Sequence, residues 1–131
     1  MDNLRKLEIA LICYAEKFAE TSDFRIIFRR KHSKTYYGYY NMLKKEIVIF
    51  LLDKYGKPYK FNHLLRTLFH EIAHHEECSE KDYKRLKGVQ HSKKWVDTFA
   101  KYLNKLWYRS DIYEVDEYLG IKGQRSRDGI S

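Results

Sequence analysis

Residues 61–78 read FNHLLRTLFHEIAHHEEC, and the expected fold is built around this stretch. Apolar side chains recur in it at intervals of three and four residues, which places them on one side of an α-helix. These side chains are Leu64, Leu65, Leu68, Ile72 and Ala73. The stretch therefore predicts a helix that is buried along one side and carries histidines on another.

Two further segments, residues 2–20 and 92–108, show the same spacing and predict an N-terminal and a C-terminal helix. The apolar stripe of the first is Leu4, Leu7, Leu11, Tyr14 and Phe18. That of the second is Trp95, Val96, Phe99, Tyr102, Leu103 and Leu106.

Between the first two helices, three short segments are rich in β-branched and aromatic residues, which suit a pleated sheet. They are FRIIFRR (24–30), TYYGYYN (35–41) and EIVIFLL (46–52). We expect a small, three-stranded, mostly antiparallel sheet. The predicted fold class is α+β, in the order helix, three strands, helix, helix.

The composition indicates one packed domain. Hydrophobic residues make up 44% of the 131 residues and aromatic residues 16%, enough for a globular core. The net charge of +8 favours acidic partners such as nucleic acid. The basic contacts that we expect are in FRRKHSK (28–34) and at Lys93 and Lys94, although a solvated charged surface explains these residues equally well.

No segment of the sequence predicts a signal peptide or a membrane span. The apolar run IALICYA (9–15) is short and lies between Glu8 and Glu16. The two cysteines, Cys13 and Cys78, are too few for a disulfide framework. We therefore expect a cytoplasmic protein that does not engage a membrane; the sequence gives no expectation for its oligomeric state.

The central helix contains HEIAH at residues 70–74. His70 and His74 are four residues apart, so both imidazoles project from the same helical face and can hold one metal ion. Glu71 is rotated by about 100° but stays near enough to reach a water molecule on that metal. The alternative is a solvated helical face on which histidines and carboxylates have no ligand.

A catalytic zinc ion has three protein ligands and one open position. The candidates for the third ligand are His91, Cys78, Glu77, Glu80 and Asp97. Residues spaced along one straight helix drift along its axis, which counts against Cys78 and Glu77. We favour His91, because it begins the next predicted helix after a loop long enough to return to the site.

The pair of motifs HEIAHH (70–75) and HSKKWVDTF (91–99) resembles the zincin metallopeptidases of the SprT-like, WLM and YgjP-like group. The resemblance implies a zincin-like single domain over residues 1–110. It also implies that His70, His74 and His91 bind Zn²⁺, that Glu71 is the general base, and that Trp95 packs the last helix in place. Ser92 stands where SprT itself usually has glycine.

The expected activity is zinc-dependent hydrolysis of peptide bonds, with a protein or peptide substrate that could be associated with nucleic acid. TYYGYYN or EIVIFLL, as a sheet edge, would align an extended substrate by backbone pairing. One alternative is a repressor-cleaving peptidase of the ImmA/IrrE type, whose third ligand is a downstream glutamate. No glutamate lies between Glu80 and Glu114, which counts against it. The other alternative is a non-enzymatic DNA-binding module stabilised by zinc.

Residues 111–131 form an acidic and aromatic tail that we expect to lie outside the catalytic domain. They hold three basic and five acidic side chains, whereas residues 1–110 hold 23 basic and 13 acidic ones. Such a tail could fold over the basic body and inhibit the enzyme; a partly ordered surface tail is the simpler alternative.

Overall fold

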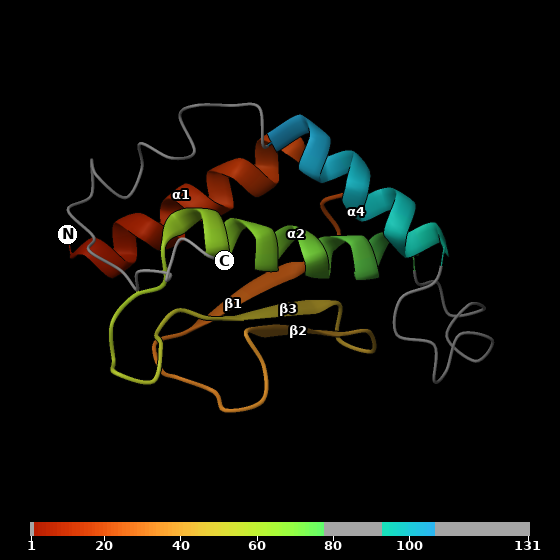
Figure 1. Cartoon of the computed structure of the whole chain (residues 1–131). Helices are drawn as coiled ribbons and strands as arrows, with labels where there is room; N and C mark the ends of the chain where they lie inside the picture. Colours follow the sequence, from red (N-terminus) through yellow and green to blue (C-terminus); the bar gives the residue numbers. More distant parts are fainter. Residues whose placement is uncertain (1, 78–92, 107–131) are drawn as a thin grey trace.

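The computed structural model describes residues 2–77 and 93–106 of the chain, and Figure 1 shows how their elements are arranged. The elements are α1 (Asn3–Phe18), β1 (Arg25–Arg29), β2 (Gly38–Asn41), β3 (Glu46–Phe50), α2 (Phe61–Glu77) and α4 (Lys93–Leu106). Within these ranges the fold is α+β, with three helices and one three-stranded sheet. The predicted order of elements is confirmed there.

The sheet is mixed, and our expectation of a mostly antiparallel sheet was wrong. The strand order is β1-β3-β2, with β1 parallel to β3 and β2 antiparallel to β3. β2 and β3 are joined by a short turn in which Lys45 adopts a φ of 51°, so this pair forms a hairpin. β3 then inserts between β2 and β1, which makes its pairing with β1 parallel.

All five residues of β3, Glu46–Phe50, are buried, as expected for a central strand. EIVIFLL therefore cannot supply a free sheet edge. The two edges are β1 and β2, so of the two expected candidates TYYGYYN provides one.

Helix α2 lies between the sheet and the other two helices, so it forms the centre of the core (Figure 1). Its predicted apolar side is buried throughout, and Phe61 and Phe69 are buried as well. In α4, Trp95, Tyr102 and Leu106 are buried, whereas Val96 is 48% exposed and does not belong to the buried stripe. None of the helices in the described ranges is both long enough and apolar enough to cross a membrane.

Strand β2 approaches α2 closely at Gly38. A Cβ atom on Gly38 would lie 2.7 Å from the carbonyl oxygen of Val48 on β3 and 2.9 Å from Cγ2 of Thr67 on α2. Both distances are shorter than a carbon atom tolerates, so glycine is needed where this edge strand packs against the helix.

Candidate metal centre

His70, Glu71 and His74 lie together on α2, with the two histidines on the face predicted from their spacing and Glu71 beside them. One ligand atom from each lies within 4.8 Å of the other two, which is close enough to hold a metal ion. The two imidazole rings are 5.1 Å apart between centroids. Both histidines are half-buried and Glu71 is only 6% exposed, so the group is partly shielded from water.

The carboxylate of Glu71 orients the ring of His70. Nδ1 of His70 donates a hydrogen bond to Oε2 of Glu71 over 2.9 Å, because a carboxylate can only accept. In the neutral imidazole this places the lone pair on Nε2 of His70. That tautomer suits metal binding, where a carboxylate partner on one ring nitrogen raises the basicity of the other.

Trp95 of α4 covers the same two histidines. Its ring is stacked with that of His74 at 5.2 Å, and its centroid lies 4.7 Å from that of His70. Its Nε1 donates a hydrogen bond of 3.1 Å to the carbonyl oxygen of His70. The ring of Phe99, one turn further along α4, lies 5.3 Å from His70. The beginning of α4 is therefore held at the candidate metal group, as expected for Trp95.

The third ligand is not identified within the described residues. His91, Cys78 and Glu80 lie outside the described ranges, so the choice of His91 stays a prediction. Of the other candidates, Glu77 is buried and Asp97 is exposed, with Oδ2 of Asp97 3.3 Å from Nζ of Lys93. Among the described residues, neither carboxylate joins the group of His70, Glu71 and His74. The acidic tail, residues 111–131, is also outside the described ranges.

His75, to which the sequence assigned no role, is buried beside the candidate metal group. Nδ1 of His75 lies 2.6 Å from the hydroxyl of Tyr40, and Nε2 lies 2.7 Å from Oδ1 of Asp23. The hydrogen bond from His75 holds the pKa of the Asp23 carboxyl below its ordinary value. The partners are 35 and 52 residues away in the sequence, so no local pattern could have indicated this network.

Another histidine, His63, lies in the first turn of the same helix, where it is partly buried in a different environment. The rings of Tyr37 and Tyr59 pack against it at 4.6 and 4.4 Å. Burial, with a smaller contribution from the charge of Arg66, lowers the pKa of His63 to about 4. His63 is therefore neutral at physiological pH and contributes to packing; it does not belong to the candidate metal group found among the described residues.

Imidazole nitrogen and carboxylate oxygen atoms are typical zinc ligands, so the donors present fit this metal. His70 and His74 supply two of the ligands, and the buried carboxylate of Glu71 lies beside them. Comparison of the chain with protein-family models, with curated proteins and with solved structures finds no match.

Proposed function

We propose that this chain is a zinc metallopeptidase of the zincin type, which hydrolyses peptide bonds in a protein or peptide substrate. One observation carries the proposal: two imidazoles one helical turn apart converge, with a buried carboxylate between them, within 4.8 Å. A purely structural zinc site has no use for such a carboxylate, whereas a hydrolytic site needs a general base next to the metal. The proposed metal ligands are His70, His74 and His91.

In this proposal each side chain has a distinct role. A zinc ion bound by these histidines would lower the pKa of a water molecule to about 7 and polarise a carbonyl group. Glu71 accepts the proton of the attacking water and passes it to the leaving amine. Its hydrogen bond to His70 keeps the carboxylate beside the metal ligands before the substrate arrives.

Two contacts of the described structure support the remaining parts of the proposal. Trp95 holds the beginning of α4 against His70 and His74, and His91 precedes Trp95 by only four residues in the sequence. This short separation in the sequence favours His91 as the third imidazole at the site. β2, a sheet edge next to α2, offers backbone groups to which an extended substrate can pair.

Zinc content and hydrolysis, measured on the same preparations, test the proposal. We expect wild type, Glu71→Gln and the exposed control His32→Ala to retain zinc after dialysis. His70→Ala and His91→Ala should weaken zinc binding by more than about a hundredfold, since each removes a ligand. Glu71→Gln should lower the hydrolysis of unfolded casein by roughly 10²–10⁴-fold while keeping the metal.

Other outcomes separate the alternatives. Wild type that retains zinc but cleaves nothing would contradict the peptidase and favour a module stabilised by zinc. Equal zinc in wild type and His91→Ala would contradict the proposed third ligand and favour Cys78 or Glu80, since neither Glu77 nor Asp97 joins the group among the described residues.

We also propose that the sheet side of the molecule contacts single-stranded nucleic acid. Residues 24–69 contain eleven lysines and arginines but only two carboxylates, Glu46 and Asp53, and both carboxylates are buried. Tyr36 and Tyr55 are 54% and 71% exposed among these basic side chains. Exposed aromatic rings between basic groups can stack on bases while the charges bind phosphates.

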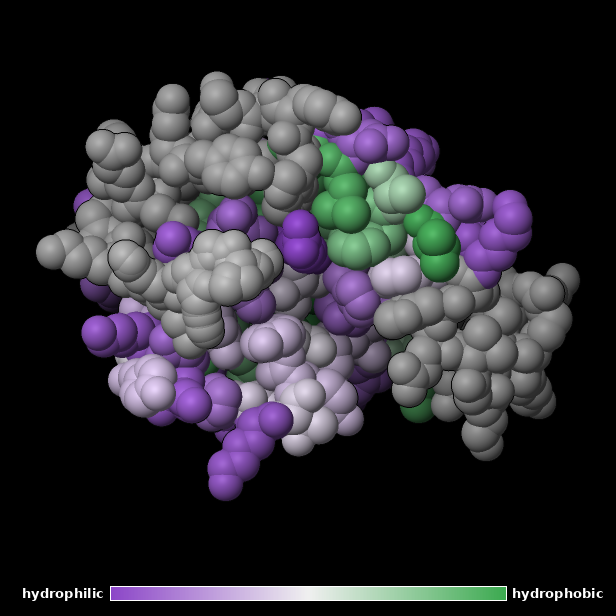
Figure 2. Space-filling model, in the orientation of Figure 1, coloured by the Kyte–Doolittle hydropathy of each residue, from purple (hydrophilic) through white to green (hydrophobic). Residues whose placement is uncertain are grey.

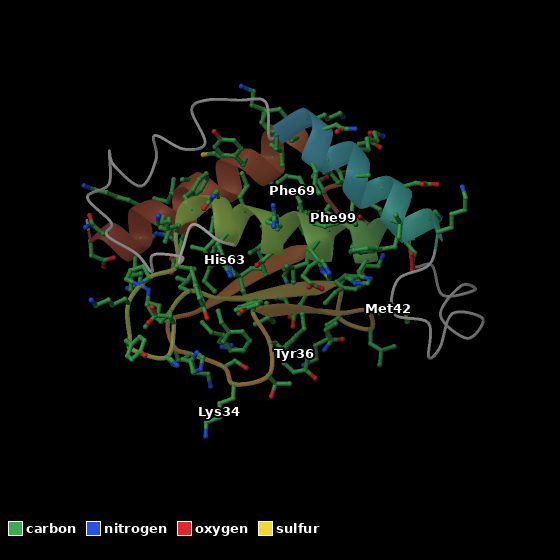
Figure 3. All side chains as sticks on the ribbon, in the orientation of Figure 1. Lys34, Tyr36, Met42, His63, Phe69 and Phe99 are labelled. Carbon is green, nitrogen blue, oxygen red and sulfur yellow. The ribbon has the colours of Figure 1, made fainter. Side chains whose placement is uncertain are left out.

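The two loops that carry these tyrosines lie side by side. The ring of Tyr37, next to Tyr36, packs on Tyr59 at 5.6 Å, which joins the β1–β2 loop to the β3–α2 loop. Lys34 points away from the body of the protein near Tyr36 in Figure 3. In Figure 2 this side is purple and pale, whereas green apolar surface gathers near α4. A substrate bound to nucleic acid could therefore be held next to β2.

A further inference from the structure

We propose that His75 is a positioning residue that fixes strand β2 against the helix carrying the metal ligands. By doing so it sets the distance between a substrate paired to β2 and the general base Glu71. This inference rests on the proposed peptidase function for its effect on substrate, but the mechanical link between strand and helix is present in the fold itself.

His75 connects three segments through its two ring nitrogens. It lies on α2, whereas Tyr40 is in β2 and Asp23 is in the connection between α1 and β1. Its ring also packs edge-on against Phe24 at 5.2 Å and Tyr40 at 5.3 Å. The side chain of His75 is only 5% exposed, whereas that of its partner Asp23 is 61% exposed.

The chemistry of the two hydrogen bonds fixes the orientation of the imidazole ring. The carboxylate of Asp23 can only accept, so Nε2 of His75 carries the proton. In the neutral imidazole, Nδ1 then accepts from the hydroxyl of Tyr40. An unpaired buried nitrogen costs about 1–3 kcal/mol, so the ring is held in the one orientation that satisfies both bonds. A leucine at position 75 would fill a similar space, but it could not form the hydrogen bond that holds Tyr40 of β2 in place.

The position of His75 along α2 links it to the candidate site. Thr67, Glu71 and His75 follow one another at intervals of four residues and therefore share a helical face. Thr67 meets β2 at Gly38, and His75 meets β2 at Tyr40. The proposed general base lies midway between these two points where the edge strand is attached to the helix.

The hydrogen bond between His75 and Tyr40 would thus determine the distance between Glu71 and a substrate paired to β2. The hydrolytic geometry tolerates little error, since displacement by about 1 Å can cost a hundredfold in rate. Loosening β2 should therefore affect productive substrate binding while the metal ligands, all outside β2, keep their places.

The test compares Tyr40→Phe and His75→Leu with His75→Gln in the full chain. Glutamine has one donor and one acceptor, so it can restore part of the network, whereas leucine restores none. Tyr59→Phe is the matched control, because it removes a hydroxyl from a buried tyrosine outside β2 that packs against α2 through His63. For each variant, zinc content, KM and kcat for a peptide, and amide hydrogen exchange in residues 38–41 are measured.

We expect Tyr40→Phe to raise KM about five- to tenfold, in line with one lost hydrogen bond, with zinc content unchanged. Hydrogen exchange in β2 should become faster in Tyr40→Phe and His75→Leu, and less so in His75→Gln. Tyr59→Phe should match wild type in KM and in the hydrogen exchange of β2.

Two results would overturn the inference. One is β2 exchange in Tyr40→Phe and His75→Leu that equals that of Tyr59→Phe. The other is faster exchange accompanied by unchanged KM, which would leave His75 with a structural role only. If wild type hydrolyses no peptide, the proposed function and the effect of His75 on substrate are both contradicted. The exchange data would still test whether His75 links β2 to α2.

Discussion

At the scale of single residues, His63 makes stability depend on pH. Its pKa is lowered from 6.5 to about 4 in the folded protein, mainly by burial. Between these values the unfolded chain binds a proton that the folded protein does not, so folding loses stability as the pH falls from 6.5 to 4. The loss is at most about 3 kcal/mol, and above pH 6.5 this contribution is constant.

Urea denaturation at pH 7, 5.5 and 4.5 measures this effect, with His63→Phe as the comparison. Phenylalanine fits an aromatic environment and does not titrate. The free energy of unfolding of His63→Phe should therefore fall less than that of wild type between pH 7 and 4.5. The exposed His32→Phe control should follow wild type. Parallel curves for wild type and His63→Phe would show that His63 is already protonated in the folded protein or is not buried there.

Residues in the candidate metal group could be predicted because their relation is local. His70, Glu71 and His74 are brought together by helical periodicity alone, and one helix suffices to satisfy it. His75 differs, because its partners Asp23 and Tyr40 reach it only after the sheet has packed on α2. A sequence pattern contains no information on such long-range polar pairs.

At the scale of elements, the helices and strands were predictable but the pairing of the strands was not. The three segments with β propensity contain β1, β2 and β3. The three segments with an apolar stripe contain α1, α2 and α4. The continuous apolar run IVIF at residues 47–50 is typical of a central strand that is buried on both faces, rather than of an edge. This signal agrees with the observed central place of β3, but it does not tell which way β1 runs beside it, and we expected a mostly antiparallel sheet.

The attachment of β2 to α2 leads to a prediction for Gly38. Alanine at this position brings a Cβ atom to 2.7 Å from the backbone oxygen of Val48 and 2.9 Å from Thr67, and a backbone atom cannot move without shifting the strand. We expect Gly38→Ala to destabilise the protein by about 1–3 kcal/mol, as overpacking does. Chemical denaturation measures the change.

The double variant Gly38→Ala/Thr67→Ser provides the control for that prediction. Serine lacks Cγ2 and relieves the contact with the helix but leaves the one with Val48. We expect it to recover part of the lost stability. Full recovery would show that β3 is not a constraint, and a neutral Gly38→Ala would contradict the close approach altogether.

At the scale of the whole molecule, charge is distributed unevenly between the sheet side and α1. The segment that forms the sheet, its loops and the first half of α2 is strongly basic, whereas α1 with its following connection contains Asp2, Glu8, Glu16, Glu20 and Asp23. Net charge indicated nucleic acid from the sequence alone. The side on which it would bind depends on the fold, because Arg30, one of the expected contacts, is 42% exposed but already pairs with Glu8 at 3.0 Å.

Binding of a fluorescein-labelled oligothymidylate, followed by anisotropy over a range of salt concentrations, tests this surface. Lys34→Gln/Lys57→Gln should weaken binding and lower the salt slope by about 1.4, or about 0.7 for each lost phosphate contact. Lys6→Gln/Lys17→Gln on α1 removes the same charge and should change the slope little. Tyr55→Ala should cost about 1–3 kcal/mol if the ring stacks on a base. Equal losses in both lysine pairs would mean that net charge alone attracts the strand, and binding of anionic vesicles without the oligonucleotide would identify a lipid surface as the partner.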